Sequence, residues 1–185
     1  MNFSVLISVY YKEKPEYLKD AINSIFNQTL RPNEVILVED GKLTDELYNT
    51  IKKLQEKYNE IKTVCLKENQ GLGPALNEGL KYCSYDIVAR MDSDDICMPD
   101  RFKIQIDFME KHPDIDIISG WIDEFYGYKE NIISIRKTPE THNEIVKFGK
   151  SRNPINHPAA MFKKNVVCNI GGYKAIPLLE DYDLW

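Results

Sequence analysis

Three aspartates stand within four positions of the segment ARMDSDD (89–95): Asp92, Asp94 and Asp95. They follow within a few residues of an apolar run that ends at Val88 and Ala89. At a separation of about 5 Å and an effective dielectric of about 20, each pair of like charges costs roughly 3 kcal/mol. Carboxylates held together against this repulsion usually share a cation, and an oxygen-only ligand set favours Mg²⁺ or Mn²⁺. The cluster therefore predicts a divalent-metal site.

A plainer interpretation of these acids is a turn followed by a helix start, because Asp and Pro are common at such places. It accounts for Asp95 and for Pro99–Asp100, but not for all three acids together. A calcium EF-hand loop that begins at Asp92 is excluded, since its sixth position would be Cys97 instead of Gly and its twelfth Lys103 instead of Glu.

The elements before and after the cluster alternate regularly. Apolar, β-branched runs predict strands over 4–10, 34–40, 62–66 and 85–91. Apolar residues at helical spacing predict helices over 18–26, 44–58, 71–83 and from Pro99 to Met109. Four strand–helix units predict an α/β fold whose mostly parallel sheet has helices on both faces. Asp40 ends the second strand, so it and the aspartate cluster should meet at the carboxyl edge of the sheet, where such folds bind ligands.

The pattern changes after residue 112. IDIISG, WIDEFYGY and NIISIRK predict short strands, EIVKFGK a short helix and PAAMFKK a further strand. LEDYDLW has the pattern of a helix start. We expect a single domain over 1–185, truncated at its C-terminus, with a smaller and more antiparallel second half.

Composition narrows the class of protein. The chain has 185 residues, 43% of them hydrophobic and 29% charged, which suits one soluble globular domain. A net charge of −5 argues against a nucleic-acid partner. The N-terminus predicts a strand and not a signal peptide, and no apolar run reaches the roughly 18 residues of a membrane span. The four cysteines predict buried or half-buried thiols in a reducing cytoplasm, without a disulfide or zinc site: Cys65, Cys83, Cys97 and Cys168.

A glycine-rich segment, GLGPALNEG (71–79), partly matches a dinucleotide-binding fingerprint. The third glycine is missing and the segment follows the third strand instead of the first, so the match is weak. Two interpretations stay open: a helix N-terminus beside phosphates, or simply a glycine-rich helix entry.

Several segments together resemble a known family. They are SVLISVYYKEKPEYLKDAINSIFNQTLRPNEVILVEDG, ENQGLGPALNEGL, IVARMDSDDICMPDRF, NPINHPAAMFKK and GGYKAIPLLEDYDLW. In this order they resemble the family-two glycosyltransferases with a GT-A fold, a Rossmann-like sheet flanked by helices. The resemblance is greatest to bacterial enzymes of exopolysaccharide, capsule or lipopolysaccharide assembly. It implies inverting transfer of a sugar from a nucleotide-sugar, commonly a UDP-sugar, to a hydroxyl of a saccharide or lipid-linked acceptor, with Mn²⁺ or Mg²⁺ as cofactor.

The resemblance also implies roles on the donor side, in a nucleotide-binding half over 1–112. Ser8 and Tyr10 would lie beside the nucleoside, and Asp40 of VEDG would accept a hydrogen bond from the base. Asp92-Ser93-Asp94 corresponds to the D-x-D motif, with Asp94 as the metal ligand and Asp92 as a contact to the ribose or sugar. For Asp40–Gly41 the alternative is an ordinary D-G turn.

On the acceptor side, over 113–185, the resemblance implies that Glu180 or Asp181 is the general base, with Asp181 favoured. The alternative for this pair is a helix N-cap with an acidic first turn. His157 would lie near the donor phosphates or the acceptor, or else be structural. Arg90 would touch the donor, support the acidic cluster, or form a structural ion pair.

The family usually continues beyond the segments matched here, into a part that completes the acceptor site and often touches the membrane. We therefore expect action in the cytoplasm at the inner face of the membrane, with peripheral attachment through that missing part. Two alternatives to transfer remain: a nucleotide-sugar-binding module without activity, and an aspartate-nucleophile phosphatase. The phosphatase would normally place its D-x-D on the first strand, which here ends in SVYY.

Overall fold

The computed structural model describes residues 1–176 and 178–185, and its first half follows the predicted alternation. The elements are β1 (Phe3–Val9), α1 (Pro15–Phe26), β2 (Glu34–Glu39), α2 (Asp45–Lys57), β3 (Ile61–Cys65), α3 (Leu72–Tyr82), β4 (Ile87–Asp92) and α4 (Arg101–Lys111). Thr44 caps α2 as its sequence suggests, since its hydroxyl accepts a hydrogen bond from the Leu47 amide at 3.3 Å. The four strand–helix units are confirmed.

One boundary in this half is wrong. The helix expected from Pro99 begins at Arg101, with Asp100 as its N-cap. The Arg101 amide donates to the Met98 carbonyl at 3.0 Å, which closes a turn ahead of the helix, and the Pro99 carbonyl accepts from the Thr29 amide at 2.9 Å. This contact with the end of α1 keeps Pro99 in the turn.

The second half contains short elements. They are β5 (Ile117–Ile118), β6 (Ile122–Phe125), β7 (Ile132–Arg136), α5 (His142–Phe148), the 3₁₀ turn η1 (His157–Ala159), β8 (Met161–Lys163), α6 (Lys164–Asn169) and α7 (Glu180–Leu184). The predicted short strands and the helix at α5 are confirmed, whereas α6 was not predicted. No helix within the described residues is long and apolar enough to cross a membrane.

A six-stranded sheet joins the two halves in the order β3-β2-β1-β4-β8-β5. β1 pairs in parallel with β2 and β4, and β2 pairs in parallel with β3. β8 then adds an antiparallel strand beside β4, and β6 and β7 form a separate hairpin. The predicted α/β fold with a mostly parallel sheet is confirmed.

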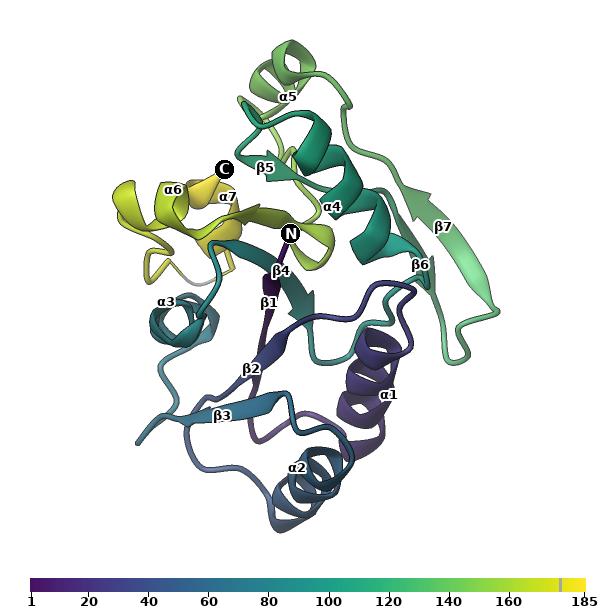
Figure 1. Cartoon of the computed structure of the whole chain (residues 1–185), viewed down its shortest axis with the longest axis vertical. Coiled ribbons are helices and arrows are strands. Elements are labelled where there is room, and N and C mark those ends of the chain that lie inside the picture. The colour runs from purple at the N-terminus through teal and green to yellow at the C-terminus, as the bar shows by residue number, and fades with distance from the viewer. Residues whose placement is uncertain (177) are drawn as a thin grey trace.

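The sheet is covered on both faces, as Figure 1 shows. One buried cluster joins β1 to α1, α2 and α4, through residues such as Val5, Ile22 and Phe102. The other joins the opposite face to α3, α6 and α7, through residues such as Leu6, Leu76 and Leu184. Side chains alternate between the faces of a strand, so neighbouring residues of β1 serve both clusters. This two-sided core fixes the carboxyl edge of the sheet.

The expectation for the cysteines is only half right. Cys83 and Cys97 are buried, but Cys65 and Cys168 are exposed, and all four thiols are free. Cys65 ends the edge strand β3, where its thiol donates to Glu39 Oε2 at 3.0 Å. A side chain on an edge strand can stay exposed to solvent where the same side chain on a central strand would be buried.

Candidate donor and acceptor sites

Three neighbouring strands bring predicted residues together at the carboxyl edge of the sheet. Ser8, near the end of β1, lies opposite Asp92 at the end of β4. On the other side of β1, the Asp40 amide donates to the Val9 carbonyl at 2.8 Å. Residues far apart in sequence therefore meet at one edge, as the strand alternation predicts.

These residues line an open hollow of about 480 Å³. Among the residues predicted from the sequence, it contains Ser8, Tyr10, Asp40, Asp92 and Asp94. The lining also includes residues without a predicted role, namely Lys12, Glu13, Lys14, Tyr17, Asn69, Gly71, Leu72 and Ser93. Arg90, His157, Glu180 and Asp181 do not line it. The structure thus brings five of the predicted residues together in one hollow, and the other four lie outside it.

The aspartate cluster carries the electrostatic cost that its sequence implies. Asp94 is exposed as a residue, but its carboxyl is partly removed from water. This desolvation, together with the charges of Asp92 and Glu13, raises the pKa of the carboxyl. Burial, followed by the charges of Asp92 and Asp94, raises the pKa of the half-buried Asp95 to about 6. The two carboxyls therefore bind a proton more readily than free ones do, and a cation would offset the same repulsion.

The residues at the hollow fit a cation that a ligand helps to bind. Within the described part of the chain, no group of three or more His, Cys, Asp or Glu side chains is arranged to hold a metal by itself. Mg²⁺ is commonly held by one or two carboxylates together with substrate phosphates, and Asp94 and Asp92 reach the same hollow. The raised pKa of Asp94 also marks the negative field that a cation would neutralise.

Arg90 lies beneath this cluster and is almost wholly buried, at 1% exposure. Its Nη1 lies within ion-pair distance of Asp92 Oδ1, but neither Nη1 nor Nε makes a hydrogen bond within the described residues. Its carbonyl accepts a hydrogen bond from Arg101 Nη2 at 2.8 Å. A buried charge is costly without a partner, so Arg90 and Asp92 fix each other's position.

Asp40 holds the loop that leads into α3. It is 3% exposed, its Oδ1 accepts from the Gln70 amide at 2.7 Å, and its Oδ2 accepts from the Gly71 amide at 3.0 Å and from Asn69 Nδ2 at 2.9 Å. Gly41 has a φ of +81°, and a Cβ there would lie 2.5 Å from the Asn69 amide nitrogen. Asp40 and Gly41 therefore form a tight turn, and Asp40 also lines the hollow.

His157 belongs to a buried group of aromatic side chains. Its Nε2 lies 3.0 Å from the Tyr173 hydroxyl, and its ring lies 6.0 Å from that of Trp185. Burial, together with the positive charge of Arg90, holds the pKa of His157 well below its usual range, so the ring is neutral near pH 7. His157 is thus packed against Tyr173 and Trp185 and does not line the hollow.

The acidic pair Glu180 and Asp181 begins α7. Asp181 Oδ2 accepts a hydrogen bond from Asn153 Nδ2 at 2.6 Å, and the acids fill the first turn of α7 behind an N-cap that is Leu179. Burial raises the pKa of Tyr173, and the charges of Asp181, Asp92 and Glu180 add to this rise. Tyr173 is therefore close enough to both acidic groups to be affected by their charges.

Sequence reasoning missed residues that hold the aspartate loop. Gln28, at the end of α1, donates through Nε2 to the Met98 carbonyl at 2.7 Å and accepts through Oε1 from the Phe102 amide at 3.2 Å. Ser24 Oγ accepts from the Cys97 amide at 2.9 Å. Such contacts join segments about 70 positions apart, so no local pattern reveals them.

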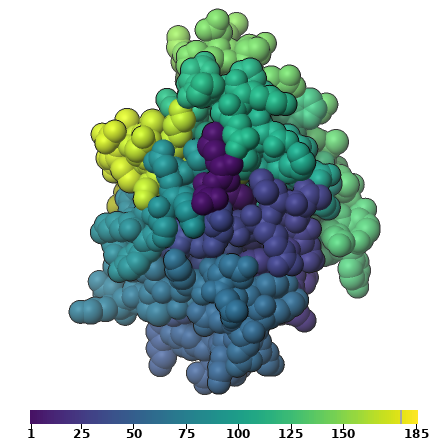
Figure 2. All heavy atoms as spheres, in the orientation of Figure 1, coloured from purple at the N-terminus to yellow at the C-terminus, as the bar shows by residue number. Residues whose placement is uncertain are grey.

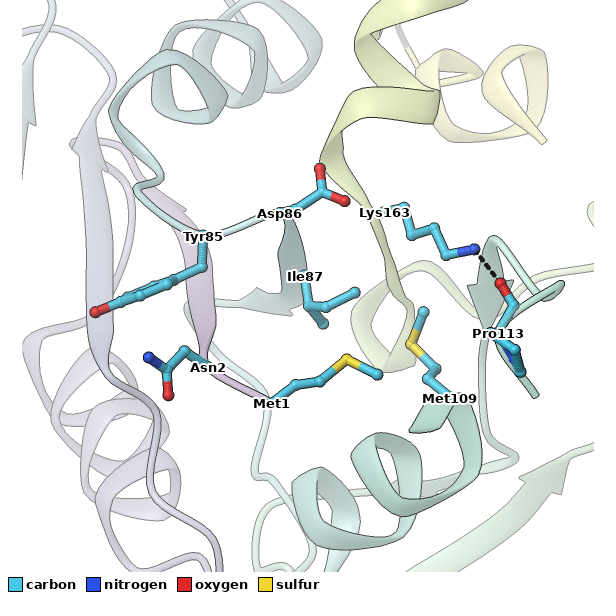
Figure 3. A pocket seen from close by; sticks show the side chains of 8 residues that line it. All are labelled: Met1, Asn2, Tyr85, Asp86, Ile87, Met109, Pro113 and Lys163. Carbon is cyan, nitrogen blue, oxygen red and sulfur yellow. Dashed lines mark hydrogen bonds between the residues drawn. The ribbon is translucent and has the colours of Figure 1, made fainter. Parts of the chain in front are cut away.

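A second hollow lies at the opposite edge of the sheet, where β1 and β4 begin (Figure 3). It has a volume of about 370 Å³ and is lined mainly by apolar side chains, among them Met1, Ile87 and Met109. Figure 2 shows the first residues of the chain at the surface in the middle of this face. None of the predicted site residues lines it, so the carboxyl edge remains the candidate site.

Comparison with known proteins identifies the family of this chain. The profile of the family described as "Glycosyl transferase family 2" matches residues 4–169. A UDP-Gal:alpha-D-GlcNAc-diphosphoundecaprenol beta-1,3-galactosyltransferase of Escherichia coli is 45% identical over 184 residues, which are 100% of this chain and 66% of that protein. An amylovoran biosynthesis glycosyltransferase, AmsE of Erwinia amylovora, is 40% identical over 183 residues, 99% of this chain and 68% of that protein.

Solved structures share the fold at low sequence identity. A mannosyltransferase of Pyrobaculum calidifontis, in complex with GDP-Man and Mn²⁺, superposes with a TM-score of 0.73 at 18% identity, covering 99% of this chain and 50% of that one. TarS of S. aureus in complex with UDP-GlcNAc gives 0.73 at 23% identity, covering 100% and 52%. The chain thus spans about two thirds of its curated relatives and about half of these structures. It has a GT-A fold and belongs to glycosyl transferase family 2.

Proposed function

We propose that this chain carries the donor site and the general base of a metal-dependent, inverting glycosyltransferase. It transfers a sugar from a UDP-sugar to a hydroxyl of a saccharide or lipid-linked acceptor, at the cytoplasmic face of the membrane. The observation that carries the proposal is the single hollow in which Ser8, Tyr10, Asp40, Asp92 and Asp94 meet. The printed name of the Escherichia coli relative, with its UDP-Gal donor and diphosphoundecaprenol acceptor, supports the donor and acceptor classes.

Residues 1–112 form the nucleotide half of this proposal. Ser8 and Tyr10 lie beside the nucleoside. Asp40 holds the loop that begins α3 and, in the earlier prediction, also accepts a hydrogen bond from the base. Both of its carboxylate oxygens already accept bonds from that loop, so a base would use a remaining lone pair. Asp92, fixed by Arg90, contacts the ribose or the sugar.

Asp94, with Asp92 beside it, would hold Mn²⁺ or Mg²⁺ at the donor diphosphate. The cation supplies charge neutralisation for the leaving nucleotide diphosphate. The chain's own part is to hold these two aspartates at the hollow, where a cation would offset the repulsion between them. The contacts of Gln28 and Ser24 with the following loop support this placement.

Residues 113–185 form the acceptor half, in which Asp181 is the proposed general base. A sugar hydroxyl is a weak nucleophile until a positioned carboxylate takes its proton. The hydrogen bond from Asn153 orients Asp181 Oδ2 and leaves the carboxylate partly accessible. In an inverting reaction the acceptor attacks opposite the leaving group, so the base must stand apart from the metal carboxylates. Asp181 is not among the residues that line the hollow with Asp92 and Asp94, which is consistent with this role.

Calorimetry of UDP binding with and without Mn²⁺ tests the metal site. We expect tight binding only with Mn²⁺, and a loss of at least tenfold in affinity for Asp94→Ala. The exposed Asp100→Ala, in the same loop, is the matched control. Equal UDP affinity with and without the cation would remove Asp94 from the metal role.

Binding and transfer assays together test the base. Asp181→Asn should bind UDP-sugar normally and lose transfer by at least a hundredfold, since general base catalysis contributes about 10²–10⁴-fold. Unchanged turnover would move the role to Glu180 or elsewhere. Donor binding without transfer by the unmutated protein would favour the binding-module alternative. A panel of nucleotide-sugars, screened by thermal shift with Mn²⁺, identifies the donor.

A further inference from the structure

One contact across the hollow joins two of its walls. Ser93, the middle residue of the D-x-D segment, donates its hydroxyl to Glu13 Oε2 at 2.6 Å. Ser93 is buried at 6% exposure, so its hydroxyl needs a partner within the protein. Residues 80 positions apart thus join the aspartate loop to the segment between β1 and α1, called here the 10–14 loop.

Glu13 also organises its own loop. Its Oε1 accepts from the Lys14 amide at 2.8 Å, directly before α1, and its own amide donates to the Tyr10 carbonyl at 3.0 Å. Both carboxylate oxygens are therefore engaged, one within the loop and one across the hollow. The loop has few other restraints: Tyr10 and Tyr11 are 42% and 49% exposed.

The 10–14 loop supplies one wall of the hollow. Tyr10, Lys12, Glu13 and Lys14 all line the hollow, as do Asp92 and Asp94. Two lysines beside carboxylates form a mixed-charge surface that suits a nucleotide diphosphate with its cation, and an exposed tyrosine offers a face for stacking. The distance between these walls depends on how firmly the loop is held.

We propose that Glu13 is a positioning residue: its hydrogen bond with Ser93 ties the 10–14 loop to the D-x-D segment and so holds Tyr10 and Lys12 against the nucleotide. This inference rests on the proposed donor site. The tie preorganises the hollow, so the loop loses less conformational freedom when a ligand binds. It also couples the order of the loop to the placement of Asp94, one residue after Ser93.

A competing role for Glu13 is purely electrostatic, since its charge lies close to Asp94. Three variants separate the two roles. Ser93→Ala removes the bond and keeps the charge, Glu13→Ala removes both, and Glu13→Gln removes the charge but keeps a carbonyl oxygen that can accept from Ser93. Glu16→Gln, an exposed carboxylate three positions along, is the matched control.

Hydrogen exchange of the ligand-free protein tests the tie directly. Loss of one hydrogen bond should speed backbone exchange in the 10–14 loop about fivefold in Ser93→Ala and Glu13→Ala. Glu13→Gln should restore most of the protection, and Glu16→Gln should match the unmutated protein. Unchanged exchange in Ser93→Ala would overturn the proposal, whatever the protein binds.

Calorimetric titration with UDP and Mn²⁺ tests the consequence. Ser93→Ala and Glu13→Ala should weaken UDP binding about fivefold, with most of the affinity recovered in Glu13→Gln. If Glu13→Gln binds as poorly as Glu13→Ala, the charge matters and the positioning role is wrong. If the unmutated protein does not bind UDP at all, the proposed donor is wrong, and the exchange measurements still decide whether the tie exists.

Discussion

Removal of the charge of Asp95 should stabilise the folded protein. Burial and the neighbouring charges raise the pKa of Asp95 from 3.8 to about 6. The folded protein therefore binds a proton there more tightly than the unfolded chain does, and stability falls as pH rises from about 4 to 6. A rise of about two pKa units corresponds to about 3 kcal/mol when Asp95 is ionised. Because the side chain keeps some contact with water, we expect the destabilisation to be about half of this 3 kcal/mol.

Asp95→Asn should accordingly stabilise the metal-free protein by about 1–2 kcal/mol at pH 7.5 and by close to zero at pH 4. Urea unfolding in the presence of a chelator, at both pH values, measures the difference. Asp100→Asn, exposed in the same loop, should show no such pH dependence. Adding Mn²⁺ at pH 7.5 should stabilise the unmutated protein more than the variant, since a cation offsets the same repulsion. Destabilisation by Asp95→Asn at pH 7.5, or an effect independent of pH, would refute this account of the loop.

Three further substitutions test other parts of the structure. Glu34 is buried, and although burial favours its neutral form, hydrogen bonds from Lys62, Ser84 and Ser4 lower its pKa. Glu34→Gln should therefore lower the free energy of unfolding, measured in urea at pH 7, by about 1–3 kcal/mol. This difference should shrink below about pH 4, as the native carboxylate is protonated. Gln28→Ala should weaken Mn²⁺ affinity, measured by calorimetry, and lower stability by about 1–3 kcal/mol, because the Met98 carbonyl of the aspartate loop and the Phe102 amide of α4 lose their partner. A Cβ at position 73 would lie 2.7 Å from the Lys174 carbonyl, so Gly73→Ala should reduce kcat by shifting the approach to α7, while UDP affinity stays the same.

Most of the fold could be predicted because its signals are local. Strand and helix periodicity in the first 111 residues gave element types that the structure confirms, and the alternation predicted a parallel sheet. A parallel sheet has the carboxyl ends of its strands at one edge, so the sequence alone predicts that Asp40 and Asp92 lie close together there. The same reasoning would have reached Glu13, which follows β1 at this edge.

Other features depend on contacts that sequence patterns do not encode. The start of α4 at Arg101 depends on the contact between Pro99 and Thr29. The exposure of Cys65 depends on β3 being an edge strand. The neutral state of His157 depends on its burial beside Arg90. Each of these outcomes is decided by a segment distant in sequence, and the roles assigned to Asp94 and Asp181 remain predictions.

The antiparallel strand β8 has a consequence for synthesis of the protein. Val88 of β4 pairs with Phe162, and the Arg90 amide donates to the Ala160 carbonyl at 2.8 Å. On the ribosome, β4 is complete about 70 residues before its partner emerges, so this apolar strand has an open edge during that time. Open edges of this kind pair readily with other chains. The nascent protein is therefore most prone to aggregation while residues 93–160 are being made, and the loop carrying the aspartates gains its final support only when β8 arrives.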